Sequence, residues 1–432
     1  MFQTISNFFR VKEIRNKILF TLLMLIVFRL GIFIPVPFTD RTAIDFINDQ
    51  QNVFGFLNIF GGGALKNFSI LAMGISPYIT ASIIVQLLQM DVVPKFTEWK
   101  SQGEMGRRKL AQVTRYATIV LAFIQATAMS IGFNAMTGGG LIADPGFGKF
   151  TTIALVLTAG TAFLMWLGEQ ITEHGVGNGI SVIIFAGIVA EIPNMVNQLY
   201  EQFFGSHVGS DELFINTVIV ALIVLVVLGL TVGVIFIQQA TRKIPIQYAK
   251  RMVNRSMVGG QSTHLPLKVN TAGVIPVIFS VSFIMAPRTI ASFFDGDFAN
   301  AIERIFDYTQ PIGMVIYVIL IIAFSYFYTF VQSNPEQMAD NLKKQGGYIP
   351  GIRPGKKTER YLTLVLYRLT FVGALFLAAV AIFPVLLGKA ANLPQSIQIG
   401  GTSILIVVGV ALQTMKQLES QLVKRHYKGF IK

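Results

Sequence analysis

Ten apolar runs of bilayer-spanning length constrain this chain more than any other feature of its sequence. Since about 20 mostly apolar residues cross the hydrocarbon core of a membrane, each run predicts a transmembrane helix. Of the 432 residues, 53% are hydrophobic and only 13% are charged, whereas about 25% are charged in a typical soluble domain. We therefore predict an all-α polytopic membrane protein. The runs begin near Ile18, Ile70, Thr114, Phe150, Gly179, Leu213, Thr271, Ile312, Tyr361 and Ser396.

Positive charge is concentrated on one side of this arrangement. Most of the 35 Lys and Arg residues lie before the first run, after the second, sixth and eighth runs, or in the C-terminal tail. Cytoplasmic segments of membrane proteins carry such an excess of Lys and Arg. Because the number of runs is even, both termini are expected in the cytoplasm, as segments 1–17 and 416–432. Long cytoplasmic loops are expected at about 238–270 and 333–360.

Glycines interrupt the hydrophobic segment between Gly55 and Leu88. The part after Ser69 is long enough to span a bilayer, whereas the part before it is too short. The triplet Gly61-Gly62-Gly63 prevents the two parts from forming one rigid helix. Inside a membrane, such a hinged short helix must pack against protein or line a cavity, because lipid cannot satisfy free backbone groups. This pattern predicts a pore with a movable element.

A short internal repeat relates the second and seventh runs. Gly74-Ile-Ser-Pro77-Tyr-Ile79 matches Gly273-Val-Ile-Pro276-Val-Ile278. Each motif lies in the second run of a set of five, and the two sets enter the membrane from opposite sides. The repeat therefore predicts two inverted five-helix halves, 18–200 and 201–415, around a central pathway. Chance stays open as the alternative, since Gly and Pro are frequent in membrane helices.

Isoleucines occur inside the second, fifth, seventh and tenth runs. Taken singly, each fits ordinary helix or lipid packing. If the interrupted helices meet at the membrane midplane, these side chains would form a dry constriction that blocks ions yet yields to a passing chain. The residues are Ile75, Ile79, Ile184, Ile278 and Ile406.

The two long basic loops exceed the usual connection of about 2–8 residues between packed helices, which indicates a function of their own. Membrane topology and lipid head groups explain part of their charge. The more specific interpretation is an anionic partner, either RNA or an acidic protein surface. The candidate docking residues are Arg242, Lys243, Lys250, Arg251, Arg255, Arg353, Lys356 and Lys357.

The sequence contains no complete motif for catalysis, metal binding or cofactor binding. The chain has no cysteine, and its 4 histidines show no metal-ligand spacing. Gly146-Phe-Gly-Lys149-Phe150 resembles the end of a P-loop, but Phe150 replaces the Ser or Thr that would hold Mg²⁺. Nor is there a nucleophile–base pair. We therefore expect no cofactor and no enzymatic activity, with energy supplied by a partner or a gradient.

Ionisable residues are scarce within the runs. Arg29 lies well inside one, and Glu191 and Arg288 lie near outer ends. An ion-coupled transporter normally buries carboxylates or histidines for its coupling ion, so proton coupling is disfavoured. Coupling to a sodium ion held by carbonyl oxygens stays open as an alternative. For Arg29 itself, snorkelling or a structural partner is favoured over a direct role.

At this point the motifs resemble the SecY/Sec61-alpha family of protein-conducting channels over essentially the full length. Five blocks carry the resemblance. They are Gly61–Leu65 with Gly74–Ile79, Trp166–Glu173 with Gly175–Ser181, Gln261–Asn270, Ala339–Lys344 with Pro350–Gly355, and Gly400–Ser403. The resemblance implies two five-helix halves around an hourglass pore in the bacterial plasma membrane. Signal sequences would leave sideways into lipid, and unfolded polypeptides would cross through the pore.

The resemblance also implies roles for particular residues. The five isoleucines match the family's pore ring, and a short helix at about 54–67 would be the plug. The plug residues are Asn58, Gly61, Gly62, Gly63, Lys66 and Asn67, and the lateral-gate residues are Thr80, Gln86, Phe283 and Ala286. Ser76 stands where a bulkier residue can occur in the family, which leaves the ring in place.

Implied partners are the subunits SecE and SecG, the motor ATPase SecA, and the ribosome through its RNA. The two basic loops would dock SecA or the ribosome, with Arg353 as the matching loop arginine. Two other functions compete with the channel. A secondary transporter of a small solute is favoured by the inverted repeat and disfavoured by the missing buried carboxylates. An intramembrane enzyme lacks a catalytic constellation.

Overall fold

Ten apolar helices correspond one to one with the ten predicted runs in the computed structural model. It describes residues 11–40, 58, 61–89, 93–142, 144–205, 213–248, 251–253, 256–258, 262–291, 296–390 and 400–428. The helices are α2 (Lys12–Gly31), α5 (Ser76–Leu88), α7 (Glu104–Met136), α8 (Phe147–His174), α9 (Gly179–Phe204), α10 (Leu213–Gln239), α11 (Ile275–Ala291), α13 (Pro311–Gln332), α15 (Lys356–Ala390) and α17 (Gly400–Lys428). Within the described residues, 6 helices are long and apolar enough to cross a membrane. The predicted all-α polytopic class is confirmed.

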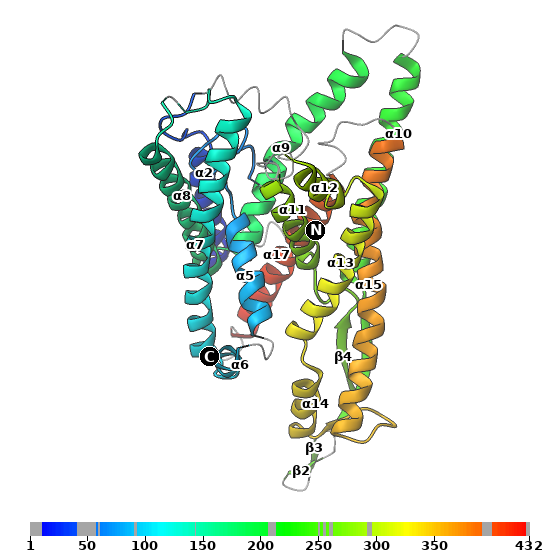
Figure 1. Cartoon of the computed structure of the whole chain (residues 1–432). Helices are drawn as coiled ribbons and strands as arrows, with labels where there is room; N and C mark the ends of the chain where they lie inside the picture. Colours follow the sequence, from blue (N-terminus) through cyan, green and yellow to red (C-terminus); the bar gives the residue numbers. More distant parts are fainter. Residues whose placement is uncertain are drawn as a thin grey trace.

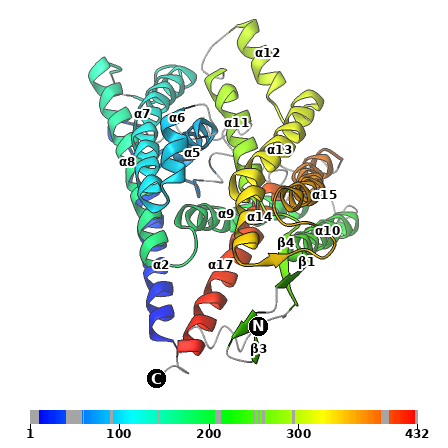
Figure 2. The same cartoon turned by 90° about the horizontal axis from the view of Figure 1, so that it is seen from below.

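The helices form two groups that meet in the middle of the molecule (Figures 1 and 2). Helices α2, α5, α7 and α8 lie on one side, and α10, α11, α13 and α15 lie on the other. Between them lie α9 and α17, which contact each other. A second contact joins the groups, because α5 packs against α11. The interrupted helices of the two predicted halves are therefore neighbours.

The second and seventh runs do not begin as helices, and here the expected boundaries were wrong. Residues 70–75 form turns, and α5 begins only at Ser76. Gly74 has φ +57° and Gly273 has φ +67°, a left-handed conformation that only glycine adopts readily. Each glycine lies two residues before its helix, and Pro77 or Pro276 follows in the first turn, where proline is tolerated. The sequence repeat is thus also a repeat in backbone geometry.

The beginning of α2 and the end of α17 lie on the same face of the bundle. Ile14 of α2 and Leu418 of α17 are buried together with Val176, which lies in the connection between α8 and α9. An even number of crossings requires this arrangement.

The long connections after α10 and α13 fold into one unit rather than two loops. Strands β1 (Thr241–Tyr248), β4 (Ser262–Lys268) and β5 (Gly347–Tyr348) form an antiparallel sheet in the order β4-β1-β5. A hairpin of β2 (Arg251–Val253) and β3 (Ser256–Val258) extends from β1. Two shorter helices, α6 (Pro94–Ser101) and α12 (Asp297–Ile305), complete the described elements together with α14 (Pro335–Lys344).

A small hydrophobic core holds this unit together. Ile244 and Ile246 alternate with exposed residues on β1 and pack against Leu342 of α14 and Leu362 of α15. Helix α14 begins at a defined cap, because the Asn334 side chain accepts hydrogen bonds from the backbone amides of two residues in its first turn. Figure 1 shows β4 and α14 beside the same end of α15. We call the sheet, α14 and the first turns of α15 the basic platform.

Candidate functional site

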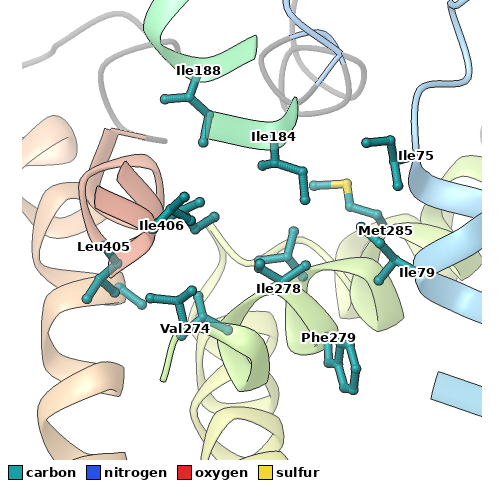
Figure 3. Packing of buried hydrophobic residues seen from close by; sticks show 14 of the residues in the cluster. Ile75, Ile79, Ile184, Ile188, Val274, Ile278, Phe279, Met285, Leu405 and Ile406 are labelled. Carbon is teal, nitrogen blue, oxygen red and sulfur yellow. The ribbon is translucent and has the colours of Figure 1, made fainter. Parts of the chain in front are cut away.

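Five isoleucines from four helices converge at the centre of the molecule (Figure 3). They belong to one buried hydrophobic cluster, with exposed fractions between 0% for Ile406 and 8% for Ile79. Ile79 lies in the first turns of α5, Ile75 is the residue just before that helix, and Ile184 lies on α9. Ile278 lies on α11 and Ile406 on α17. The structure therefore brings together every residue that the sequence proposed for a constriction.

This convergence follows from the positions at which α5 and α11 begin. In both helices an isoleucine follows the proline by two residues, Ile79 after Pro77 and Ile278 after Pro276. The shared turn geometry places both isoleucines in the first helical turns, on elements that contact each other. Aliphatic side chains offer no hydrogen bonds, so a constriction lined by them excludes hydrated ions by dewetting.

The sequence interpretation missed other members of this cluster. Ile188 and Met285 are 2% and 4% exposed, and Figure 3 shows them beside Ile184 and Ile79 respectively. Ile188 follows Ile184 by one turn of α9, and Met285 follows Ile278 by two turns of α11. Helical spacing was the available signal. Met285 adds a flexible side chain that adapts to irregular space.

The glycine triplet packs against α9 next to this cluster. Gly62 has φ +64°, and a Cβ atom added to it would lie 3.0 Å from the backbone of Gly187. Gly187 is situated between Ile184 and Ile188 on α9. A side chain at Gly62 would therefore both strain the backbone and force the segment away from α9.

Within the described part of the predicted plug, only Asn58 is helical. Residues 61–67 form turns, and residues 54–57, 59 and 60 lie outside the described residues. The segment is held by local bonds, because the Asn58 side chain accepts from the Lys66 amide at 2.8 Å. Asn58 also accepts through its carbonyl oxygen from the Gly63 amide at 2.9 Å. Lys66 and Asn67 are exposed, so the segment presents a polar edge.

Longer-range bonds fasten the end of this segment. The Phe68 carbonyl accepts from the Val36 amide at 3.1 Å, and the Ile70 amide donates to the Ile34 carbonyl at 3.0 Å. The Phe68 ring is buried against Phe133 of α7, with 5.8 Å between ring centroids. The segment thus ends at fixed contacts just before α5.

Arg29 supplies a direct link from α2 to the glycine triplet. Its guanidinium Nη1 donates a hydrogen bond of 2.6 Å to the Gly62 carbonyl oxygen. The guanidinium also lies 5.4 Å from the Phe33 ring centroid, a cation–π distance. Of the alternatives that the sequence left open, the structural partner is the one realised.

Arg288 also has a partner that the sequence interpretation did not identify. It forms an ion pair with Asp307, at 3.4 Å between Nη1 and Oδ1, and the two side chains are 7% and 18% exposed. The same Asp307 oxygen accepts from the Thr309 hydroxyl at 2.8 Å. This pair ties the end of α11 to the segment that enters α13.

The predicted lateral-gate residues lie on the two facing helices α5 and α11. Thr80 donates its hydroxyl to the Ser76 carbonyl at 3.1 Å. Phe283 is 50% exposed, and its ring lies edge-on to Phe324 of α13, at 6.2 Å between centroids. Ala286 lies on α11, but its side chain is outside the described residues.

A cleft of about 300 Å³ lies between α5 and α7 on one side and α13 on the other, at the Gln86 end. Gln86 lines it and donates to the Ser82 hydroxyl at 3.1 Å, whereas its Oε1 is buried without a hydrogen-bond partner among the described residues. Sequence reasoning found Gln86 but not the residues opposite. They are Tyr328 and Gln332 of α13, with Gln89 and Arg107 beside Gln86.

Five of the eight predicted docking residues are exposed on the basic platform or in the turn just before α15. Arg242 and Lys243 are exposed on β1, and Arg353, Lys356 and Lys357 are exposed before and at the start of α15. The Thr358 hydroxyl donates to the Arg353 carbonyl at 3.0 Å and fixes that turn. Arg251 lies on β2, whereas Lys250 and Arg255 lie outside the described residues.

Known proteins similar to this chain identify its family. The family model described as SecY matches residues 69–415. The protein translocase subunit SecY of Bacillus licheniformis is 70% identical over 433 residues, which cover 100% of both chains. The fold resembles a solved protein-conducting channel, with a TM-score of 0.64 and 18% identity over 97% of this chain and 95% of that chain. Sec61 in the canine ribosome–channel complex gives a TM-score of 0.60 and 17% identity with the same coverage. The chain belongs to the SecY family.

Proposed function

We propose that this chain is a passive protein-conducting channel. It lets unfolded secretory polypeptides cross the membrane and releases hydrophobic segments into lipid. The observation that carries the proposal is the convergence of five isoleucines from both helical groups and from α9 and α17 between them, with the same turn geometry before α5 and α11. They are Ile75, Ile79, Ile184, Ile278 and Ile406. These residues act as the pore ring, because a dry aliphatic constriction blocks ions but has no fixed groups that would trap a passing chain.

The plug in this proposal is the segment that contains Asn58, the glycine triplet, Lys66 and Asn67. Its contact with α9 beside Ile184 and Ile188 supports the role, as does the bond from Arg29. A plug must be held by few bonds, since it has to leave the pore and return. Glycines suit this function because they allow close packing without side-chain anchors.

The lateral gate lies between α5 and α11, with α7 and α13 behind them. Thr80, Gln86, Phe283 and Ala286 belong to it. The direct contact between α5 and α11 supports this role, as does the cleft between α5, α7 and α13. Opening would separate these helices and expose the pore to lipid.

The basic platform is proposed as the docking surface for SecA or the ribosome. Its exposed cations, Arg242, Lys243, Arg353, Lys356 and Lys357, suit an anionic partner. We include Arg251, which lies on β2, together with Lys250 and Arg255. Its hydrophobic core supports the role, because a folded surface costs less to order on binding than two free loops. SecE and SecG are the proposed companion subunits.

We place the chain in the bacterial plasma membrane with both termini cytoplasmic. The proposed parts are the cytoplasmic ends 1–17 and 416–432 and the halves 18–200 and 201–415. The excess of Lys and Arg supports this orientation. The burial of Ile14 and Leu418 in one cluster supports the same side of the membrane for the beginning of α2 and the end of α17.

The test is reconstitution. Vesicles that contain the chain with SecE should import an unfolded preprotein when SecA and ATP are supplied. Saturable uptake of a small solute without any partner, together with no preprotein import, would overturn the proposal and favour the transporter. Vesicles with SecE alone serve as the control for passive leakage.

A further inference from the structure

An open groove of about 760 Å³ lies along the first turns of α15. Its lining includes Lys356, Arg360 and Arg368, together with one carboxylate, Glu359. Arg360 and Arg368 are exposed, and neither forms an ion pair within the described part of the chain. The groove therefore presents an excess of positive charge that the protein itself leaves unneutralised.

This charge lies where the apolar outer face of α15 begins. Leu364, Phe371 and Leu375 are between 46% and 49% exposed and recur at helical spacing on that face. Such a stripe on a membrane-spanning helix faces lipid. Arg368 lies within the stripe, about 12 Å along the helix from Arg360 at 1.5 Å per residue. An arginine at this depth needs an anionic partner or must reach back to the interface.

Aromatic rings make one wall of the groove rigid. Tyr367 lines the groove, and its ring lies 4.7 Å from the Phe330 ring and 5.6 Å from the Tyr326 ring, both on α13. The Tyr326 hydroxyl donates to the Tyr367 carbonyl oxygen at 3.3 Å. Tyrosines are typical of the level of lipid head groups. Together the rings locate the groove at the membrane interface.

We propose that this groove binds the head group of an anionic phospholipid from the leaflet on the side of the basic platform. The phosphate lies between Arg360 and Arg368, where both guanidinium groups can donate hydrogen bonds to it. The acyl chains lie along Leu364, Phe371 and Leu375. A soluble anion would neutralise the two arginines but would make no contact with the apolar stripe. A phospholipid fits both the arginines and the stripe, so it is the proposed occupant.

The test measures lipid enrichment next to α15. Because the chain has no cysteine, Leu375→Cys gives a single site for a fluorophore at the expected depth of the acyl chains. The labelled chain is reconstituted with its subunits into phosphatidylcholine vesicles that contain a small fraction of brominated lipid. Brominated phosphatidylglycerol should quench the fluorophore more strongly than brominated phosphatidylcholine does, as expected for a local enrichment of at least about fivefold. This factor follows from the ~1 kcal/mol that each basic residue near the membrane surface contributes to binding of anionic lipid.

Three variants make the result specific. The double substitution Arg360→Gln with Arg368→Gln should abolish the preference, whereas Arg360→Lys with Arg368→Lys should keep most of it. Lys149→Gln with Arg304→Gln removes the same charge at the other end of the bundle and should change nothing. Lys356 is left intact because it belongs to the proposed docking surface.

Three outcomes would overturn the proposal. One is equal quenching by the two brominated lipids in the unsubstituted chain. Another is loss of the preference when inorganic phosphate is added at constant ionic strength, which would assign the groove to a soluble anion. Persistence of the preference in the Gln double variant, with the protein still folded by circular dichroism, would likewise refute it.

Discussion

The guanidinium of Arg29 donates a 2.6 Å hydrogen bond to the carbonyl oxygen of Gly62 and so joins α2 to the proposed plug. The bond crosses 33 positions of sequence and ends at a backbone atom. A charged side chain on a carbonyl gives a strong bond without requiring a particular side chain on the plug. The plug can therefore consist of glycines and still be held.

Replacement of Arg29 by alanine should make the resting channel leak ions. A hydrogen bond to a charged group contributes about 1.5–3 kcal/mol, so its loss shifts the equilibrium toward a displaced plug by roughly tenfold or more. Single-channel recordings in planar bilayers measure this. Arg15→Ala, on the same helix but exposed, is the matched control. Equal leakage in the two variants would contradict the role of Arg29.

Gly62→Ala should produce a leak through a different cause. A left-handed conformation costs an L residue about 1–2 kcal/mol, and the new Cβ would lie 3.0 Å from Gly187. Gly138 separates the two effects, because it has φ +63° and nothing within 4 Å of its added Cβ. We expect ion flux in vesicles to rise for Gly62→Ala and to stay at the resting level for Gly138→Ala. A leak of the same size in both would exclude the contact with α9 as the cause.

The constriction predicts a sharp difference between two isoleucines of α5. Ile79 is 8% exposed and Ile84 is 41% exposed, and both substitutions to glycine cost the helix about 1 kcal/mol relative to alanine. Only Ile79→Gly opens the dry seal, so only it should conduct small ions in single-channel recordings. Ile278→Gly should behave like Ile79→Gly. Silent recordings for both would show that these residues do not form the seal.

The side chains of Gln86 and Thr80 differ in their hydrogen bonding. Gln86 Oε1 has no partner among the described residues, and such a buried atom costs about 1–3 kcal/mol. Gln86→Leu should therefore stabilise the closed gate and reduce insertion of weakly hydrophobic signal sequences. Thr80 already bonds to the Ser76 carbonyl, so Thr80→Val should have little effect. Import assays with signals of graded hydrophobicity measure both, and an unchanged hydrophobicity threshold in Gln86→Leu would contradict the prediction.

Hydropathy alone predicted the existence of all ten helices, because each must satisfy its backbone inside lipid. The true beginnings of α5 and α11 were missed, although Gly74 and Pro77 carried the signal. A positive φ at glycine and a proline in the first turn mark a helix start rather than a helix interior. The proposed ring came from isoleucines inside four of the runs and from the family resemblance, and its role stays a prediction.

Other features of the structure could not be predicted from local sequence patterns. The turns at 61–67 depend on Arg29 and Gly187, and their neighbours bond to Ile34 and Val36, all distant in sequence. The strands of the platform did leave a signal, because buried Ile244 and Ile246 alternate with exposed residues. Their pairing with β5 brings together segments about 100 positions apart, which periodicity does not predict.

Charge reversal at Arg353 should impair docking without disturbing the fold. Its side chain is exposed, and the turn is held through its backbone carbonyl by Thr358, so Arg353→Glu leaves the platform intact. Loss of one cation and gain of one anion at an anionic interface should lower SecA-driven import by roughly tenfold or more, equivalent to about 1.4 kcal/mol. Arg304→Glu makes the same change on α12, away from the platform, and should import normally. Normal import by Arg353→Glu at limiting SecA would exclude Arg353 from the docking surface. A weaker contact with SecA lowers the import rate most when SecA is scarce.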